Sequence, residues 1–304
     1  MRIYLLMEKT FMPKHILVTG TNGQLGQEFQ SLVAHHDRLD DVDKFYFTNS
    51  STLDITNEEA LKSFVIQNDI DTIINCAAYT AVDKAEEDAK MAEKVNAVAV
   101  KNMAELAKEK HLKLMHVSTD YVFDGTSQTP LEENNATNPQ GIYGETKLAG
   151  EKAILDVNPE GAVIIRTSWI YSTTGHNFVK TMLRVGAERE EINVVCDQIG
   201  TPTYARDLAR TILTMFENNH ESSGVSIYHY SNEGNCSWYD FAQAIFEIAQ
   251  IDCKVNPIST SDYPTPAKRP LYSVLNKDKI KEDYGIKIPY WRDSLKTCLA
   301  ILDE

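Results

Sequence analysis

A glycine-rich turn near the start of the chain constrains its fold more than any other feature. The apolar run His15–Thr19 leads into a GxxGxxG pattern, which opens an amphipathic helical stretch. Glycines permit a tight turn and a close approach of the backbone to a pyrophosphate, and the helix N-terminus offers free N–H groups. The pattern therefore predicts a dinucleotide site, although an ordinary glycine turn is the alternative. The candidate contacts in it are Gly20, Asn22, Gly23, Gln24, Leu25 and Gly26.

Short apolar runs alternate with helical patterns through the first half of the chain. The expected strands are His15–Thr19, Lys44–Phe47, Thr72–Cys76, Leu112–Val117 and Ala162–Arg166. The expected helices between them are Gln24–Ala34, Glu58–Asn68 and one long helix within Ala85–Lys110. Buried strands bounded by helices indicate an α/β fold with a doubly wound parallel sheet, Rossmann-like in its connections.

The second half has looser spacing, with glycines and prolines between short elements. We expect residues 13–168 to form the dinucleotide-binding domain and residues 169–304 mainly a smaller C-terminal α/β lobe that binds substrate. The boundary is approximate, because the two parts can interleave. Residues 1–12 are expected to form a leader outside the fold, because they carry no strand–turn–helix context.

Charge and cysteine usage exclude several classes of partner. The net charge is −14 and the cations form no run, so neither nucleic acid nor an anionic membrane surface is expected as a partner. No apolar run approaches the roughly 20 residues of a membrane span. The five cysteines are scattered without a CxxC pair, which predicts reduced thiols in the cytoplasm and no metal site built from cysteine.

The end of the second strand bears on the choice of cofactor. NAD-binding folds commonly place a carboxylate there to hold the ribose hydroxyls, whereas this chain has Asn49 and Ser50. Nothing at that position repels a 2′-phosphate, so the sequence predicts NADPH, with NADH tolerated. Asp54 follows shortly afterwards. It is either an N-cap for the helix that starts near Asn57 or a contact to the adenine side of the cofactor.

A YxxxK pattern supplies the candidate chemistry. Tyr143 and Lys147 lie four residues apart, and so share one face of a helix. An ammonium beside a phenol favours the phenolate, so we expect Lys147 to lower the pKa of Tyr143 toward the working range. Such a tyrosine can exchange a proton with a carbonyl or alcohol oxygen. A hydroxyl at Ser118 or Thr119, after the fourth strand, can donate to the same oxygen. A solvated helix face is the alternative interpretation of YxxxK.

Taken together, these motifs resemble the extended short-chain dehydrogenases/reductases and, more narrowly, the dTDP-4-dehydrorhamnose reductase family. The resemblance covers nearly everything from Lys14 onward. The segments that carry it are 75–86 (NCAAYTAVDKAE), 117–125 (VSTDYVFDG), 143–151 (YGETKLAGE), 166–171 (RTSWIY), 197–202 (DQIGTP), 205–209 (ARDLA) and Arg269-Pro270.

The resemblance implies roles for individual positions. Tyr143 matches the proton donor, Lys147 its partner and a holder of the nicotinamide ribose, and Thr119 the hydroxyl that tunes Tyr143. Cofactor contacts are matched by Gly23, Gln24, Leu25, Asp54, Ile55, Ala77, Ala78 and Tyr79. Contacts to a dTDP-linked deoxysugar are matched by Thr119, Asp120 and Trp169, for which a core aromatic is the alternative. Arg206 and Arg269 are further candidates for the diphosphate, because guanidinium groups fork onto phosphate, or else they form surface ion pairs.

The same resemblance narrows the reaction. Related dehydratases place an Asp-Glu pair after the catalytic threonine, whereas here Asp120 is followed by Tyr121, which disfavours elimination. The expected reaction is therefore NADPH-dependent reduction of a C4 keto group in a dTDP-linked 4-dehydro sugar, the last step of dTDP-rhamnose biosynthesis. Two alternatives stay open: an epimerase that retains NAD, and a non-catalytic regulatory subunit of the methionine adenosyltransferase type.

The family resemblance raises two accessory features, a homodimer and a Mg2+ ion. Glu28 matches one of the family's Mg2+ positions, but a surface glutamate is the alternative interpretation of that residue. No complete set of metal ligands follows from the sequence.

Overall fold

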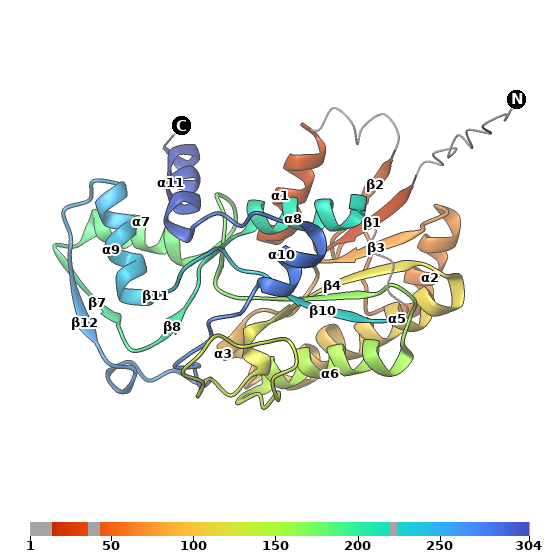
Figure 1. The fold of residues 1–304 in the computed structure, drawn as a ribbon, viewed down its shortest axis with the longest axis horizontal. Helices are drawn as coiled ribbons and strands as arrows, with labels where there is room; N and C mark the ends of the chain where they lie inside the picture. Colours follow the sequence, from red (N-terminus) through yellow and green to blue (C-terminus); the bar gives the residue numbers. More distant parts are fainter. Residues whose placement is uncertain (1–13, 36–42, 219–223, 304) are drawn as a thin grey trace, which may run out of the picture.

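The computed structural model describes residues 14–35, 43–218 and 224–303. Its centre is a six-stranded sheet in the order β10-β5-β4-β3-β1-β2, in which every pairing is parallel. The strands are β1 (His15–Thr19), β2 (Lys44–Phe47), β3 (Thr72–Asn75), β4 (Lys113–Thr119), β5 (Val163–Thr167) and β10 (Ser226–His229). The prediction of a doubly wound parallel sheet is confirmed (Figure 1). The expected leader, residues 1–12, lies outside the described residues.

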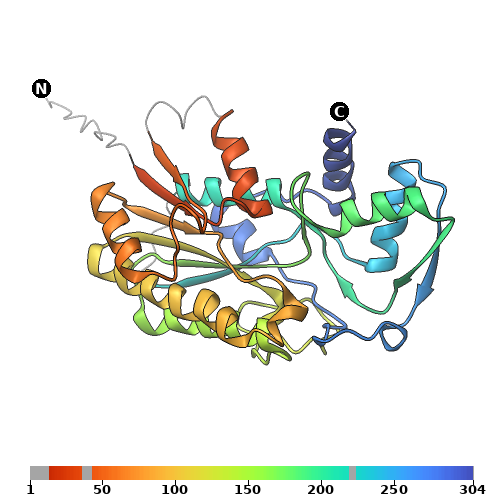
Figure 2. The ribbon, with the colours of Figure 1, turned by 180° about the vertical axis from the view of Figure 1, so that it is seen from behind.

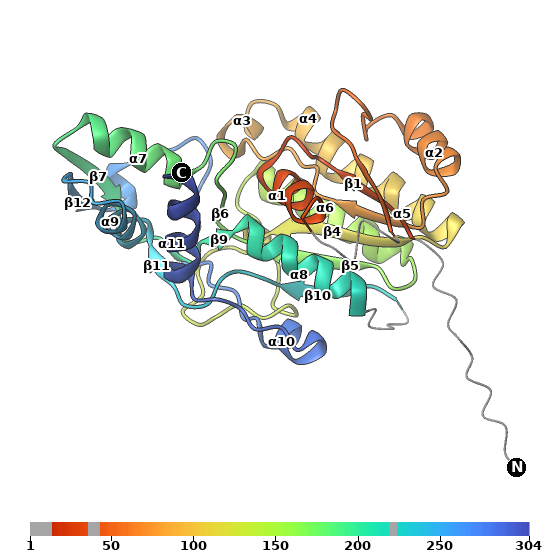
Figure 3. The same cartoon turned by 90° about the horizontal axis from the view of Figure 1, so that it is seen from above.

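Helices cover both faces of this sheet, as Figure 3 shows from above. One face packs against α1 (Gln24–Val33), α8 (Ala205–Asn218) and α10 (Asp278–Tyr284) through residues such as Phe29 and Ile212. The other face packs against α2 (Glu58–Gln67), α5 (Ala99–Lys110) and α6 (Ile142–Val157) through residues such as Leu61, Met103 and Ile154. Because both faces are buried, the central strands carry continuous apolar runs, which is the pattern seen in the sequence.

The long helix expected within Ala85–Lys110 is interrupted in the structure. α3 (Val82–Ala85) is separate, and α4 (Ala89–Glu93) continues through a π-helical turn (Lys94–Val98) into α5. The π-turn turns the fully buried Asn96 inward, where its Oδ1 accepts from the Tyr79 N–H at 2.8 Å and its Nδ2 donates to the Tyr79 carbonyl at 3.1 Å. One side chain thus satisfies both backbone polar groups of Tyr79, in the loop after β3. The periodicity of the sequence alone does not reveal such a π-helical insertion.

A smaller lobe is formed by the C-terminal half, on the left in Figure 1 and on the right in Figure 2. Its core contains Phe241, Ile245 and Leu295. Its helices are α7 (Phe178–Glu188), α9 (Trp238–Ile248) and α11 (Trp291–Leu302), with a 3-10 turn at Thr260–Asp262. Its strand pairs are β12 (Lys254–Ile258) with β7 (Glu191–Val195), β11 (Cys236–Ser237) with β8 (Ile199–Gly200), and β6 (Ile170–Tyr171) with β9 (Thr203–Tyr204).

The chain crosses between the two lobes more than once. α8 packs against α1, and β10 pairs with β5 at the edge of the large sheet, although both follow residue 168. The expected division into residues 13–168 and 169–304 stays a prediction, and its interleaving is visible in these two elements. Each of the five cysteines is unpaired. Among the described residues, no helix combines the length and the apolar character that crossing a bilayer requires.

A buried ion pair joins α6 to the sheet. Glu151 on α6 accepts from Arg166 on β5, with an Nη2–Oε2 distance of 2.7 Å, and both side chains are at most 3% exposed. Ser118 on β4 donates to the other carboxylate oxygen, Oε1, at 2.5 Å. His229 on β10 lies 3.5 Å from Arg166, between Nε2 and Nη1. This network fixes the height and rotation of α6 above three strands.

Removing one partner of this pair should therefore destabilise the fold strongly. We expect Glu151→Leu to lower the free energy of unfolding by about 3–5 kcal/mol, because Arg166 keeps its charge in a buried site. The double variant Glu151→Leu/Arg166→Met removes both charges and should lose much less. Urea denaturation of the single and double variants measures this difference. Equal losses in the two variants would show that the network does not act as a buried pair.

Candidate active site

A cavity of about 670 Å³ opens where the carboxyl ends of the central strands meet the C-terminal lobe. Neighbouring strands β1 and β3 are followed by helices on opposite sides of the sheet, so a crevice forms where their carboxyl ends diverge. Doubly wound folds bind ligands at this point. The cavity is lined by residues of the glycine turn, the YxxxK helix and both lobes, so the fold itself brings the separate sequence motifs together.

The glycine turn forms one wall of the cavity. Gly20 has φ of +72°, and a Cβ there would stand 2.6 Å from the Ala77 backbone. At Gly26 a Cβ would stand 2.5 Å from the Thr21 Cα, so the helix can lie this close to the preceding turn only because residue 26 is glycine. These two positions explain the motif physically. The resulting backbone cradle at the N-terminus of α1 fits a pyrophosphate.

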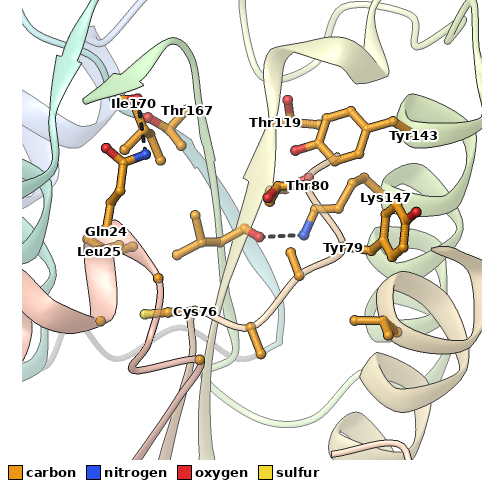
Figure 4. Close-up of a pocket in the computed structure, with 18 of the residues that line it drawn as sticks. Gln24, Leu25, Cys76, Tyr79, Thr80, Thr119, Tyr143, Lys147, Thr167 and Ile170 are labelled. Atoms are coloured by element: carbon orange, nitrogen blue, oxygen red, sulfur yellow. Dashed lines mark hydrogen bonds between the residues drawn. The ribbon is translucent and has the colours of Figure 1, made fainter. Parts of the chain in front are cut away.

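Gln24 links this turn to the other lobe. Its amide nitrogen donates to the Ile170 carbonyl at 3.5 Å (Figure 4). Its amide oxygen accepts from Asn177 at 3.0 Å. The helix that begins the cofactor site therefore contacts the segment that carries the expected sugar site. Both lobes therefore contribute to the cavity wall at this junction.

Asn49 and Ser50, at the end of β2, line the cavity as the sequence predicts. Asp54 lines it as well, but does not cap the following helix. Asn57 is the N-cap, with its Oδ1 accepting from the Ala60 N–H at 3.1 Å, so the capping interpretation of Asp54 is wrong. Asp54 instead accepts hydrogen bonds from both the N–H and the hydroxyl of Thr56, which lower its pKa. A carboxylate held ionised in this way is available to donor groups of a ligand.

The three candidate catalytic residues meet inside the cavity. Thr119 ends β4, while Tyr143 and Lys147 occupy successive turns of α6, and Figure 4 shows Thr119 and Tyr143 side by side above Lys147. Burial raises the pKa of Tyr143 to about 12, and the hydrogen bond with Thr119 opposes this rise. Tyr143 is therefore protonated at neutral pH, which suits a proton donor.

The expected effect of Lys147 on the tyrosine is not found. The Nζ of Lys147 turns away, donating to the Val117 carbonyl at 2.7 Å and lying 3.3 Å from Nε2 of His116. Burial lowers the pKa of Lys147 itself to about 8. The prediction that this ammonium lowers the pKa of Tyr143 is therefore wrong, because the lysine is engaged by β4.

Asp120 is a buried carboxyl group in the cavity wall. It is 2% exposed, its Oδ1 accepts from the Thr119 hydroxyl at 3.0 Å, and its Oδ2 has no hydrogen-bond partner among the described residues. Burial raises the pKa of Asp120 to about 6, and the neighbouring hydroxyls of Ser273 and Thr119 oppose this rise. An unpaired carboxylate oxygen at the cavity wall is suited to accept from a ligand hydroxyl.

Two stacked indoles form the wall of the cavity on the side of the smaller lobe. The rings of Trp169 and Trp238 lie 3.6 Å apart with an interplanar angle of 12°. Trp169 adopts φ of +46°, which is uncommon for a bulky residue. A Cβ at Gly200 would stand 2.6 Å from its ring, so this glycine makes room for the indole. Trp169 is thus a half-buried residue that lines the cavity and also packs against the core of the smaller lobe, and Trp238 is a partner that the sequence did not indicate.

The two candidate phosphate-binding arginines lie outside the cavity lining. Arg269 pairs with Asp83 at 2.6 Å, and its Nη1 has no hydrogen-bond partner among the described residues. It lies beside the cavity residue Tyr121. Burial raises the pKa of Tyr121, and this guanidinium opposes the rise in part. Arg206 pairs instead with Glu28 at 3.7 Å. Their role toward a diphosphate stays a prediction.

Glu28 is not the surface glutamate that the sequence suggested as an alternative. Its side chain is 3% exposed, and it accepts from the Ser172 hydroxyl at 2.6 Å in addition to its pairing with Arg206. Within the described ranges, no cluster of three His, Cys, Asp or Glu side chains is placed to hold a metal ion. Glu28 therefore serves as a buried link between α1 and the C-terminal lobe.

Every other candidate residue from the sequence lines the cavity. These are Gly20, Asn22, Gly23, Gln24, Leu25, Gly26, Asp54, Ile55, Ala77, Ala78, Tyr79, Thr119, Asp120, Tyr143, Lys147 and Trp169. The lining also contains residues that sequence reasoning missed, including Cys76, Thr80, Tyr121, His176 and Trp238. Cys76 and Thr80 belong to the loop after β3 and could have been found from that strand's end. No local pattern marks His176 or Trp238, which reach the cavity from the smaller lobe.

A doubly wound sheet with a glycine cradle and a Thr–Tyr–Lys set at its carboxyl edge defines the extended short-chain dehydrogenase/reductase class. The model of one family, described as the RmlD substrate binding domain, matches residues 14–304. A dTDP-4-dehydrorhamnose reductase from Aggregatibacter actinomycetemcomitans is 40% identical, over 94% of this chain and 98% of its own length. The chain therefore belongs to the dTDP-4-dehydrorhamnose reductase family.

Solved structures show the same relationship. A dTDP-4-dehydrorhamnose reductase from Clostridium acetobutylicum has a TM-score of 0.89 and 42% identity, covering 95% of this chain and all of that one. The Bacillus anthracis dTDP-4-dehydrorhamnose reductase, solved in complex with NADP, has a TM-score of 0.89 and 37% identity over the same shares. Fold and family thus agree along nearly the whole chain.

The raised pKa of Asp120 predicts a pH-dependent stability. Its folded pKa lies above the unfolded value of 3.8, so the stability that its protonated form contributes is lost as pH rises from about 4 through 6. Asp120→Asn removes this loss. The free energy of unfolding of the variant, relative to that of the native protein, should therefore be higher at pH 7.5 than at pH 5 by roughly 1–1.5 kcal/mol. Urea denaturation of both proteins at the two pH values measures it. A stability difference that is independent of pH would contradict the buried, unpaired carboxylate.

Proposed function

We propose that the chain reduces the C4 keto group of dTDP-4-dehydro-L-rhamnose to give dTDP-L-rhamnose, the final step of dTDP-L-rhamnose biosynthesis, with NADPH as cofactor. The observation that carries this proposal is the convergence of Thr119, Tyr143 and Lys147 with the glycine turn in a single cavity. Membership of the dTDP-4-dehydrorhamnose reductase family supports the substrate.

NADPH, when bound, supplies the hydride for the sugar carbon. The residues of this chain bind, orient and protonate. Tyr143, protonated because burial raises its pKa, gives its hydroxyl proton to the sugar oxygen at C4. Thr119 orients the tyrosine hydroxyl, and Lys147 holds the nicotinamide ribose. Asp120 accepts from a sugar hydroxyl through its unpaired Oδ2.

The two ends of the substrate and cofactor fall to other residues. The glycine turn, Asp54, Ile55 and the segment 77–79 hold the dinucleotide. Trp169, stacked on Trp238, offers an indole face to a sugar or base ring of the dTDP-sugar. Arg269, beside the cavity residue Tyr121, and Arg206 neutralise the diphosphate when these side chains release their present carboxylate partners.

The absence of a carboxylate at Asn49 and Ser50 supports NADPH, with NADH tolerated. The solved B. anthracis relative contains NADP, which agrees with this choice. The five unpaired cysteines support a cytoplasmic location. A homodimer and a Mg2+ requirement stay expectations from the family.

A coupled assay separates this function from its alternatives. The protein is incubated with dTDP-glucose, the two upstream enzymes and NADPH, and absorbance loss is followed together with dTDP-L-rhamnose. The reductase consumes one NADPH for each product molecule. An epimerase would contain bound NAD and change the sugar without net NADPH loss, and a regulatory subunit would show no turnover.

Removing the tyrosine hydroxyl tests the assigned proton donor. Tyr143→Phe should lower kcat by at least ~10²-fold, the usual scale for a positioned acid, while NADPH still binds. Tyr46→Phe, on β2 outside the cavity lining, is the matched control and should keep its kcat. Steady-state kinetics and cofactor titration measure both. Near-normal turnover of Tyr143→Phe would remove this residue from the mechanism.

Introducing a carboxylate at the end of β2 tests the choice of cofactor. Ser50→Asp or Asn49→Asp should weaken NADPH relative to NADH, because the carboxylate repels the 2′-phosphate. The expected change is a few kcal/mol at most in this solvated loop, or about tenfold for each 1.4 kcal/mol. Ser50→Asn has the same size without the charge, and should leave the NADPH/NADH ratio of kcat/KM near that of the native protein. An unaltered ratio in both Asp variants would refute this interpretation of the second strand.

A further inference from the structure

A row of buried polar side chains crosses the sheet beneath Lys147. Thr19 on β1 pairs in register with Asn75 on β3, and Asn75 pairs in register with His116 on β4. Each of the three side chains is at most 1% exposed. Lys147 on α6 completes the row, with Nζ at 3.3 Å from Nε2 of His116. The row is therefore a continuous chain of hydrogen bonds that ends on a residue assigned to the reaction.

Backbone geometry fixes the direction of this chain. The Ala77 N–H can only donate, and it is shared between Oδ1 of Asn75 at 3.2 Å and the hydroxyl oxygen of Thr19 at 3.4 Å. The Thr19 hydroxyl donates to the same oxygen at 2.7 Å. The other amide atom of Asn75 is therefore its nitrogen, which donates to Nδ1 of His116 at 2.9 Å. Nδ1 of His116 must then be the unprotonated nitrogen of the ring.

A neutral imidazole with a free Nδ1 carries its proton on Nε2. We propose that Asn75 and His116 are positioning residues, which hold the Nε2–H of His116 against the Nζ of Lys147 and so shift this lysine toward its neutral amine. An amine lone pair accepts from that N–H while the amine still donates to the Val117 carbonyl. If Lys147 were an ammonium, its N–H groups would face the Nε2–H of His116, and neither group could accept a hydrogen bond from the other. The proposal rests on the proposed role of Lys147.

The surroundings of Lys147 agree with this polarity. Burial lowers the pKa of His116 well below its usual value, so the ring stays neutral. Burial also lowers the pKa of Lys147 to about 8, while the carboxylate of Glu151 on the same helix opposes this change. Burial raises the pKa of Cys76 to about 12, so its thiol carries no charge at neutral pH. Tyr143, one turn away, is also neutral.

The row also ends inside the protein. Thr19 is fully buried, and its hydroxyl proton goes to Asn75. It therefore cannot relay protons to solvent, and its effect is to set the protonation state of Lys147. That lysine should bind the ribose best as the ammonium, so kcat/KM for NADPH should fall as pH rises through about 8.

A first experiment measures the tautomer without any substrate. The full-length protein is labelled with ¹⁵N-histidine, and the two ring nitrogens of His116 are identified by their loss in His116→Gln, or in His116→Asn if the first variant does not fold. We expect a neutral ring with the proton on Nε2 between pH 6 and 9. A proton on Nδ1, or a ring that is doubly protonated, overturns the proposal even if the enzyme is an active reductase.

A second experiment measures the consequence for the lysine. In His116→Gln, the side-chain oxygen can accept from both Asn75 and Lys147, which favours the ammonium. The alkaline limb of kcat/KM for NADPH should move up by about one pH unit, the scale of one hydrogen bond. Thr19→Val disturbs the same row but keeps the Ala77 contact that sets its direction, so its limb should stay in place. A limb in His116→Gln that is unmoved, or moved down, overturns the proposal; a lower kcat without such a shift would mark His116 as merely structural.

Discussion

The placement of α6 on the sheet is the constraint on which the site depends. Two charged side chains one turn apart, Lys147 and Glu151, enter the protein interior from this helix. Glu151 meets Arg166 in a buried ion pair, and Lys147 meets the Val117 carbonyl and His116. A buried carboxylate needs a cation and a buried amine needs hydrogen-bond partners, so the position of the helix has to satisfy both side chains at once. That position places Tyr143 beside Thr119 at the carboxyl edge of the sheet, where the cavity lies.

The partners of this helix are arranged by strand register. Thr19, Asn75 and His116 form one row across the sheet, and Ser118, Arg166 and His229 form the next, because paired positions two residues apart face the same side. The first row contacts Lys147 through His116, and the second contacts Glu151 through Ser118 and Arg166. Two rows of polar groups in this sheet thus lie where the reacting helix docks.

Local motifs predicted much of this arrangement. Short sequence motifs identify the glycines at 20, 23 and 26, the YxxxK pair and the hydroxyl of Thr119. All of these residues line the cavity. What the sequence did not predict depends on tertiary contacts. The π-turn turns Asn96 toward both backbone polar groups of Tyr79, and Trp238 meets Trp169 through packing within the smaller lobe, between segments that are far apart in the sequence. The orientation of Lys147 toward β4, and with it the raised pKa of Tyr143, required the burial of both side chains.

The proposed reaction depends on Tyr143 as the group that meets the sugar oxygen, and one structure tests this directly. A crystal of the protein with NADP and dTDP-L-rhamnose would show the distance from the Tyr143 hydroxyl to the oxygen on C4 of the sugar. The account predicts hydrogen-bond distance, about 2.6–3.2 Å, with Thr119 beside the same oxygen. A sugar whose C4 oxygen is held by other side chains, with Tyr143 out of reach, would contradict it.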